Sequence, residues 1–451
     1  MKILFPKSLC LALGLACLPA LAVAQSYLPL PETTAPVYRP VSSYYAQNAT
    51  GSSLINHVGE PPVADVDEIP SPSDNVVTDA SPYMPSPAAS YGKSMGKGCG
   101  KGIGCCGGGC WYGGAYGMFL ARDDEREMQI SVYTTNERDA ILSNLSADME
   151  TTAGNQLTIG RLLKCGTAAV ELTYWEIDPS AQQYAVYDPD GIGVGSDLLT
   201  AFDFSTLNYD DGLGGSAAIG DWVDNAEVHQ LRRNWDIENV ELNFLHHTCC
   251  GTCGGIGGKS GKCGSCNRYE ISLLAGFRHL RFDENFLFQA DEADALIDGT
   301  SEEVRYLIDV ENRLYGLQLG CRTDYYHGCR LGLHATGKFG LYANDIDHWS
   351  YIGGERGAAV VGAGPNAGRA FDIRSSKTEM TFMGELDLGA SYQLSCRWRA
   401  RAGYRVMAIS GIALTGEQVP VYFQDIDGVA NIDSECSLIL HGGYAGLEYC
   451  F

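Results

Sequence analysis

The stretch MTFMGELDLGASYQL, residues 380–394, alternates in polarity from end to end and decides the fold. Its even-numbered positions are apolar or small, and its odd-numbered positions include Glu385 and Asp387. Residues 397–408, which follow a tight turn, alternate in the same way. The polar face of this second stretch carries Arg397, Arg399, Arg401 and Arg405. Period-two alternation predicts neighbouring β-strands with one apolar face and one charged face.

The length of the strands separates two all-β architectures. Strands of soluble sandwiches usually run about 5–6 residues, whereas about 9–11 residues cross a bilayer at a tilt. The alternating segments of this chain are of the longer kind, and strands in a membrane must close because irregular backbone cannot face lipid. We predict a closed antiparallel transmembrane β-barrel of ten strands, at about residues 111–122, 151–164, 168–178, 236–247, 268–282, 304–324, 330–346, 372–394, 397–414 and 437–451.

Short and long connections alternate between these segments. The long loops fall at about residues 123–150, 178–235, 283–303, 347–371 and 415–435. In outer-membrane barrels the short turns face the periplasm, the long loops face outside, and the number of strands is even. A further spanning strand at residues 128–134 would change the count, so twelve strands is the alternative.

The chain divides into four parts by composition. Residues 1–24 have the charged, apolar and small-residue regions of a secretory signal peptide. Residues 25–97 are rich in Pro, Ser and Tyr and predict a disordered linker. Residues 98–110 form a Gly/Cys-rich segment, and the barrel occupies residues 111–451. With a formal net charge of -24, the chain is a poor nucleic-acid binder, because phosphate contacts need clustered Lys and Arg.

The last predicted strand ends in an aromatic residue with apolar residues at alternate positions before it. These positions are Ala445, Leu447, Tyr449 and Phe451. The pattern is similar to the signal that outer-membrane assembly machinery reads. We therefore expect a bacterial outer-membrane location, with outer-membrane lipid and the barrel-assembly machinery as partners. The linker would reach a further partner in the envelope.

Four phrases of the sequence carry a family resemblance. They are LLAGFRHLRFDENF (273–286), NRLYGLQLGCR (312–322), LGLHATGKFGLYAND (331–345) and the terminal GGYAGLEYCF (442–451). In these phrases the chain resembles a family of outer-membrane β-barrel proteins from planctomycete bacteria, mostly of unknown function. The resemblance covers about residues 111–451 and implies a barrel that reaches the last residue. It implies no catalytic residues.

The charged faces of the strands are expected to line the lumen. Glu385 and Asp387 fall opposite or diagonal to Arg405 in either same-face register. A barrel of eight to ten strands has an interior little wider than its side chains, so mixed charges would pair across strands and fill it. The expected lumen-facing charges are Arg330, Lys338, Glu385, Asp387, Arg397, Arg399, Arg401, Arg405 and Glu448.

Three functions remain open at this point. The first is a structural barrel with a charge-filled lumen that displays acidic loops at the surface. The second is a narrow porin-like channel for small solutes, in which the arginines would favour anions. The third is a soluble secreted β-sandwich adhesin, whose apolar strand faces would pack on each other.

Cysteines gather at the predicted periplasmic end. They are Cys249, Cys250, Cys253, Cys263, Cys266, Cys329 and Cys396. An oxidising compartment favours disulfides among them. Two C-x-x-C pairs can also bind zinc, although their gap is shorter than the usual ~15–20 residues. Cross-links to a neighbouring protein are the third possibility, and the sequence does not give the connectivity.

The predicted strands carry no enzyme signature. The sequence contains no H-E-x-x-H, its one G-x-S-x-G match (Gly92 to Gly96) lies in the predicted disordered linker, and its histidines do not pair with a plausible nucleophile. We expect no enzymatic activity, no cofactor and no assigned metal.

Overall fold

A computed structural model gives the fold from residue 111 onward. The predicted signal peptide, linker and Gly/Cys-rich segment lie outside the described residues. None of the described helices is long and apolar enough to cross a membrane. The structure describes residues 111–123, 126–133, 141–147, 151–163, 168–188, 198–224, 226–248, 268–327, 330–395 and 397–451.

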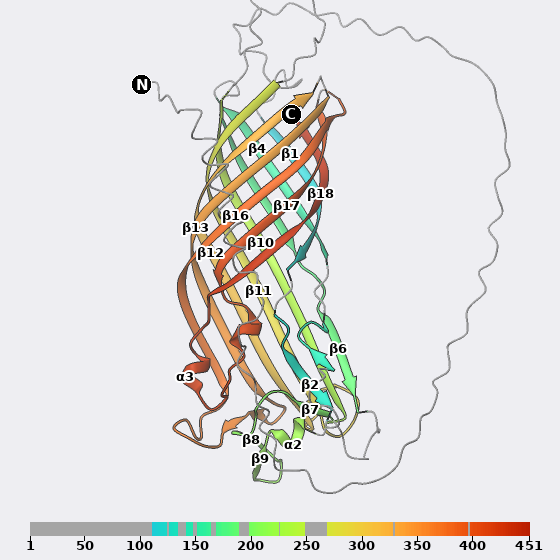
Figure 1. Ribbon diagram of the computed structural model, residues 1–451, viewed down its shortest axis with the longest axis vertical. Helices are drawn as coiled ribbons and strands as arrows, with labels where there is room; N and C mark the ends of the chain where they lie inside the picture. Colours follow the sequence, from blue (N-terminus) through green and yellow to red (C-terminus); the bar gives the residue numbers. More distant parts are fainter. Residues whose placement is uncertain are drawn as a thin grey trace, which may run out of the picture. The chain divides into compact units, whose positions relative to one another are not determined.

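Ten long strands form a closed antiparallel ring (Figure 1). Each pairs with two ring neighbours, and the ring closes where β10 meets β11 and β18 meets β1. The predicted closed barrel of ten strands is confirmed, and a β-sandwich is excluded because a sandwich does not close. The ring strands are β1 (Trp111–Arg122), β4 (Thr152–Leu163), β5 (Ala168–Ile177), β10 (Val228–Thr248), β11 (Arg268–Asp291), β12 (Glu303–His327), β13 (Leu331–Gly354), β16 (Asp372–Gln393), β17 (Trp398–Ile412) and β18 (Cys436–Cys450).

The alternative of twelve ring strands is wrong. The segment predicted at 128–134 forms β2 (Gln129–Tyr133), which pairs with β3 (Leu142–Ser143) and β7 (Leu198–Thr200) in a separate small sheet. Ile130 and Val132 of β2 are buried. Its alternation therefore reflects packing against the barrel's own loops and not contact with lipid.

Large apolar side chains cover the outward face of the ring. This apolar belt includes Phe119, Leu157, Leu172, Leu242, Phe277, Leu317, Leu341, Phe382 and Leu447, all of which are exposed. Aromatic side chains gather at one edge of the belt, on the short-turn rim, where β12 meets β13 and β16 meets β17. These aromatic residues are Trp111, Tyr269, Tyr325, Tyr392, Trp398, Tyr449 and Phe451. An apolar band with an aromatic girdle is the surface that a bilayer requires.

Five ring strands continue well past the apolar belt. β10, β11, β12, β13 and β16 have 21 to 25 residues each. The predicted long loops at 178–235, 283–303 and 347–371 are therefore shorter than expected, because their ends are strand. Of the charged residues in the predicted loop at 283–303, Asp283 occupies an outward-facing strand position and Glu284 an inward-facing one. We call this part of the ring the outer extension.

Polarity reverses between the belt and the outer extension. In β11 the outward positions change from Phe277 to Arg281 and Asp283, while Phe282 and Phe286 on the inward face are fully buried. β12 changes in the same way as it leaves the belt, with the outward residue Arg313 beside the buried Leu314. The outer extension therefore has the polarity of a soluble protein, with a wet outside and an apolar inside.

Loop segments fill the outer extension with a second apolar cluster, the outer core. Phe202 and Phe204 pack against Tyr306 of β12 and against Phe423, with ring centroids 4.8 to 6.4 Å apart. The surrounding short elements lie together at one end of the barrel in Figure 1. They are β6 (Gln182–Tyr187), β8 (Leu207–Asp210), β9 (Ser216–Ala218), α2 (Gly220–Val223), β14 (Gly357–Ala358), β15 (Val360–Val361), η2 (Thr415–Gln418) and α3 (Ile426–Val429).

A bulge in β17 directs the chain from the wall toward the interior. The register between β17 and β18 shifts at Ser410/Ile412, and Gly411 between them has φ +89°. Glycine adopts this conformation without strain, and bulges bend the strand that carries them. Asn344 and Thr381 both donate to the carbonyl of Gly411. The bulge therefore positions the following buried residues, which lead into η2.

Candidate functional site in the barrel interior

Five charged side chains meet at the centre of the barrel interior. They come from five different strands: Glu241 of β10, Arg278 of β11, Lys338 of β13, Glu385 of β16 and Arg405 of β17. We call them the central ion-pair cluster. All five occupy inward-facing positions because strand side chains alternate between faces, and Glu241, Arg278, Glu385 and Arg405 are buried.

Contacts within the central ion-pair cluster pair every charge with an opposite one. Arg278 bridges Glu241 and Glu385. Lys338 Nζ lies 2.9 Å from Glu241 Oε2 and 3.0 Å from Glu385 Oε1. Arg405 Nε lies 3.6 Å from Glu385 Oε1. Charges buried in this way need such pairing, because taking each ion out of water costs several kcal/mol.

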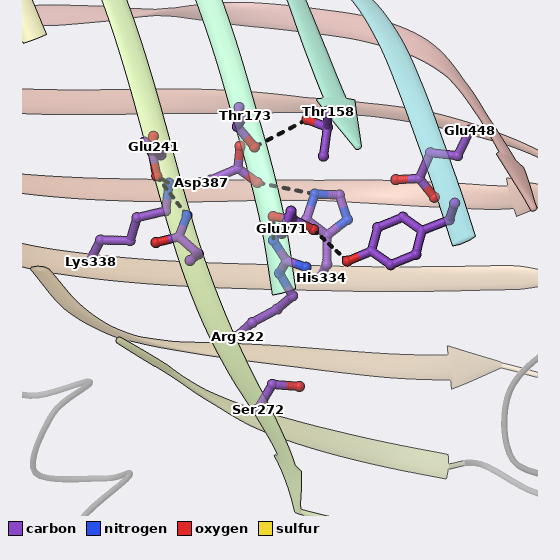
Figure 2. Close-up of polar contacts among 12 residues, drawn as sticks. Thr158, Glu171, Thr173, Glu241, Ser272, Arg322, His334, Lys338, Asp387 and Glu448 are labelled. Carbon is purple, nitrogen blue, oxygen red and sulfur yellow. Dashed lines mark hydrogen bonds and ion pairs between the residues drawn. The ribbon is translucent and has the colours of Figure 1, made fainter. Parts of the chain in front are cut away.

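A second group, the His334 cluster, lies beside the first. His334 Nε2 is 3.1 Å from Asp387 Oδ1, and the two side chains point toward one another in Figure 2. Tyr444 donates a 2.8 Å hydrogen bond to the same carboxylate oxygen. Arg401 Nη1 is 3.3 Å from Glu448 Oε1 and Arg401 Nη2 is 3.9 Å from Asp387 Oδ1, so this arginine links two acids.

A third group lies nearer the short-turn rim. Tyr112 donates a 2.9 Å hydrogen bond to Glu171, whose other oxygen is 3.3 Å from Arg322 Nη2 (Figure 2 shows Glu171 and Arg322). His247 Nδ1 is 2.7 Å from Ser272 Oγ. Polar contacts thus continue from the centre of the interior toward this rim.

Apolar residues occupy the interior on the other side of the central ion-pair cluster. They form one buried group that includes Trp175, Trp235, Leu280, Phe282, Leu314, Met407 and Ile409. Beyond them, Glu284 Oε1 is 2.6 Å from Arg122 Nη1 and 2.8 Å from Arg233 Nη2. Its second oxygen accepts the backbone N–H of Thr415 at 2.9 Å. This buried triad connects the wall to the segment that follows the Gly411 bulge.

The outer core contains a histidine with a shifted pKa. His229 Nδ1 is 2.8 Å from Ser131 Oγ, and His229 Nε2 is 2.7 Å from the carbonyl of Val223. The side chain is fully buried in the outer extension, beyond the apolar belt. Burial lowers the pKa of His229 to about 4, against the smaller raising effect of the Val223 carbonyl. The imidazole is therefore neutral at pH 7.

The predicted lumen charges divide into two groups in the structure. Lys338, Glu385, Asp387, Arg399, Arg401, Arg405 and Glu448 occupy inward-facing positions of the ring. Arg330 and Arg397 do not, because each lies in a short turn where the strand alternation has ended. Arg330 Nη1 is 3.4 Å from the hydroxyl of Tyr392, and Arg397 Nη1 is 3.2 Å from that of Tyr449. Placing these two arginines in the lumen was wrong.

Two other predicted groups have different positions. Leu447, Tyr449 and Phe451 lie on the outward side at the end of the chain, with the rings of Tyr449 and Phe451 5.1 Å apart. Ala445 shares their face, since it pairs with Gly117 of β1. The predicted cysteines Cys249, Cys250, Cys253, Cys263, Cys266, Cys329 and Cys396 lie outside the described residues.

Sequence reasoning missed the triad of Arg122, Arg233 and Glu284. The predicted long loop at about residues 283–303 includes Glu284. A usable signal was present, since Phe282, Glu284 and Phe286 share one face of an alternating segment. A carboxylate between two buried phenylalanines indicates an inward position with a cationic partner.

The described interior offers no evident ligand site. No group of three or more His, Cys, Asp and Glu side chains within the described ranges is arranged to hold a metal ion. A cavity of about 220 Å³ lies where β4 and β10 leave the belt, and its lining includes Thr152, Gln182 and the interior residues Arg233 and Trp235. The charged side chains inside the ring form ion pairs between strands.

Comparison with known proteins supplies a family match. The family described as "Putative beta barrel porin-7 (BBP7)" matches residues 124–429. No curated protein matches the chain.

Solved structures similar to the chain are outer-membrane proteins of several bacteria. The outer membrane protease OmpT of Escherichia coli is 10 % identical, covering 76 % of this chain and 94 % of its own, with a TM-score of 0.34. A major outer membrane protein of Thermus thermophilus is 13 % identical, covering 76 % and 99 %, with a TM-score of 0.28. The toluene transporter TbuX of Ralstonia pickettii is 10 % identical, covering 77 % and 91 %, with a TM-score of 0.20.

Proposed function

We propose that this chain, which belongs to the family described as "Putative beta barrel porin-7 (BBP7)", is an outer-membrane barrel with a closed, charge-filled lumen. Its role is structural: it anchors a surface-displayed outer extension in the bacterial outer membrane. The role is not enzymatic. The expected partners remain outer-membrane lipid, the barrel-assembly machinery and an envelope partner of the N-terminal linker.

The bridge that Arg278 makes between Glu241 and Glu385 carries this proposal. The three side chains come from β11, β10 and β16, so the bridge crosses the ring from one wall to another. An ion that passed this level would have to separate buried, paired charges. Next to it, the group around Trp235 and Phe282 consists mainly of apolar side chains and offers few polar groups to replace an ion's hydration shell.

Surface display is supported by the character of the outer extension. Its outward positions carry charged side chains, and its interior is the apolar outer core. Such a structure is stable in water beyond the membrane because it has the polarity of a soluble domain. The long-loop end is the extracellular end in barrels of this class.

The first experiment is envelope fractionation followed by a gel of unboiled and boiled samples. We expect the protein in the outer-membrane fraction with a mobility that depends on heating, as a closed barrel resists detergent until it is heated. A soluble protein without a mobility shift would contradict the proposal.

The second experiment measures conductance of the purified full-length protein in planar bilayers. We expect no stable openings for the wild type. A narrow porin is the second candidate, favoured by the three arginines of β17, Arg399, Arg401 and Arg405, which lie on one inward face. Stable, anion-selective openings that change when these arginines are replaced by Gln would establish the porin and overturn the closed lumen.

A further inference from the structure

Three exposed arginines stand at the short-turn rim, beside the aromatic edge of the apolar belt. Arg161 is on an outward-facing position of β4. Arg330 lies in the turn before β13, and Arg397 lies in the turn before β17. They are distributed around the ring, since β4, β13 and β17 are not neighbours.

Each of these arginines contacts an aromatic side chain of the girdle. The guanidinium carbon of Arg161 is 5.3 Å from the ring centroid of Trp111. Arg330 donates to the hydroxyl of Tyr392, and Arg397 donates to the hydroxyl of Tyr449. Aromatic side chains at a membrane interface lie at the level of the lipid headgroups. These contacts therefore fix the three guanidinium groups at that level.

The two edges of the apolar belt differ in charge. Among the described residues, the last two outward-facing positions of each ring strand at the short-turn rim include no Asp or Glu. At the opposite edge, Arg281 and Arg313 are each paired with acids of neighbouring strands. The outward-facing acids of that edge include Asp236, Glu238, Asp283, Glu311, Asp345 and Asp347.

We infer that Arg161, Arg330 and Arg397 bind the headgroup phosphates of phospholipids in the leaflet at the short-turn rim, which is the periplasmic leaflet. The planar guanidinium group donates two parallel hydrogen bonds to a phosphate. Within the described part of the chain, neither Arg161 nor Arg330 has a carboxylate partner, so a phosphate would supply an anion to these two. This inference depends on the membrane position of the belt and is independent of whether the lumen is closed.

The strength of such contacts sets the expected effect. One arginine near an anionic membrane surface gains ~1 kcal/mol, which is about a fivefold preference for an anionic over a zwitterionic lipid at its site. The opposite edge supplies a matched control. Arg374 of β16 is also exposed and lies 4.6 Å from the ring centroid of Trp349, but beyond the belt.

The test uses the full-length protein reconstituted in phosphatidylcholine vesicles with spin-labelled lipids. Electron paramagnetic resonance gives the association of labelled phosphatidylglycerol relative to labelled phosphatidylcholine. The variants are the combined Arg161→Gln, Arg330→Gln, Arg397→Gln protein and the single Arg374→Gln control. A heat-dependent mobility shift on gels verifies that each variant forms a barrel.

We expect the wild type and Arg374→Gln to select phosphatidylglycerol and the combined variant to lose this selection. Equal selection by the combined variant and the wild type would overturn the inference, as would a loss of the same size in Arg374→Gln. A wild type that binds soluble glycerol phosphate through these arginines but shows no selection of phosphatidylglycerol would assign the arginines to a free phosphate and overturn lipid binding. None of these outcomes changes what the conductance measurement says about the lumen.

Discussion

The stability of this barrel depends on single buried charges in its interior. Arg278 is about 1 % exposed and contacts two carboxylates that are equally buried. A buried ion pair adds little net stability compared with apolar residues of the same size, but an uncompensated buried charge is costly. The important quantity at this site is therefore the balance of charges and not the number of contacts.

Replacement of Arg278 tests this balance. Arg278→Met removes the cation that bridges Glu241 and Glu385, leaves both buried carboxylates without this partner, and is expected to lower the free energy of unfolding by about 3–5 kcal/mol. Urea unfolding in vesicles measures the change. Arg278→Met combined with Glu385→Gln neutralises one of these two carboxylates and should recover part of the loss. Arg281→Met, whose charge is partly exposed, should cost no more than ~1 kcal/mol; equal losses at both arginines would contradict this account.

His229 gives the outer core a dependence on pH. Its pKa is near 6.5 in an unfolded chain and about 4 in the folded one, so the unfolded state binds the proton first as the pH falls. The contribution of the neutral imidazole is complete above about pH 6.5 and is lost progressively down to pH 4, by up to about 3 kcal/mol. Amide protection factors of β2 should therefore decrease between pH 7 and pH 5. His229→Asn, which does not titrate, should flatten this dependence; an unchanged slope would assign it to another group.

Elements of this barrel combine two environments along one strand. β11 and β13 begin with an apolar outward face and end with a polar one, and the antiparallel β12 begins with a polar outward face and ends with an apolar one. The outward-facing side chains of one strand therefore contact lipid in one half of the strand and water in the other half. The point at which polarity reverses marks the edge of the membrane on each strand.

Arginine substitutions on either side of this point test its position. Leu317 of β12 is 71 % exposed in the belt, and Leu317→Arg is expected to destabilise the barrel in a bilayer by ~2–4 kcal/mol. Ser376 of β16 is exposed on the outward face of the outer extension, where Ser376→Arg should change stability by less than ~0.5 kcal/mol. Unfolding by urea in vesicles compares the two. Similar costs would mean that the membrane covers both positions.

The strands of the belt could be predicted from sequence, and the interior of the outer extension could not. Residues 380–394 alternate between lipid and a charged interior, so one period-two pattern gives both the strand and its faces. Residues 281–286 also alternate, but with charges outside and phenylalanines inside, and a run of charges usually indicates a loop. Arg330 and Arg397 precede β13 and β17 and extend the alternation of those strands in sequence, but both lie in turns at the rim. The partners of Glu284 come from distant strands, which no local pattern reveals.

In the whole barrel, different groups of residues occupy successive levels along the barrel axis. Aromatic residues and arginines lie at the short-turn rim, paired charges occupy the interior within the belt, and the outer core fills the extension. The level of the paired charges joins several strands, since Glu241, Arg278 and Glu385 belong to β10, β11 and β16. The same ring strands thus form both the belt in the membrane and the wall of the outer extension.

Epitope insertion tests the orientation of this wall. An epitope inserted at Gly299, an exposed turn position between β11 and β12, should bind antibody on intact cells. The same epitope at Ser395, in the turn before β17, should bind only after the outer membrane is permeabilised. The heat-dependent mobility of both proteins verifies folding. The reverse pattern of labelling would contradict the proposed surface display.

The seam between β1 and β18 has a consequence for the order of events during folding. Tyr112 and Cys450 are register partners from opposite ends of the described chain, and pairings between such distant residues form slowly. Until that seam forms, two strand edges carry backbone groups without partners, which the hydrocarbon of a bilayer does not tolerate. Insertion and closure must therefore occur together, and an intermediate with only part of the ring has no stable place in the membrane.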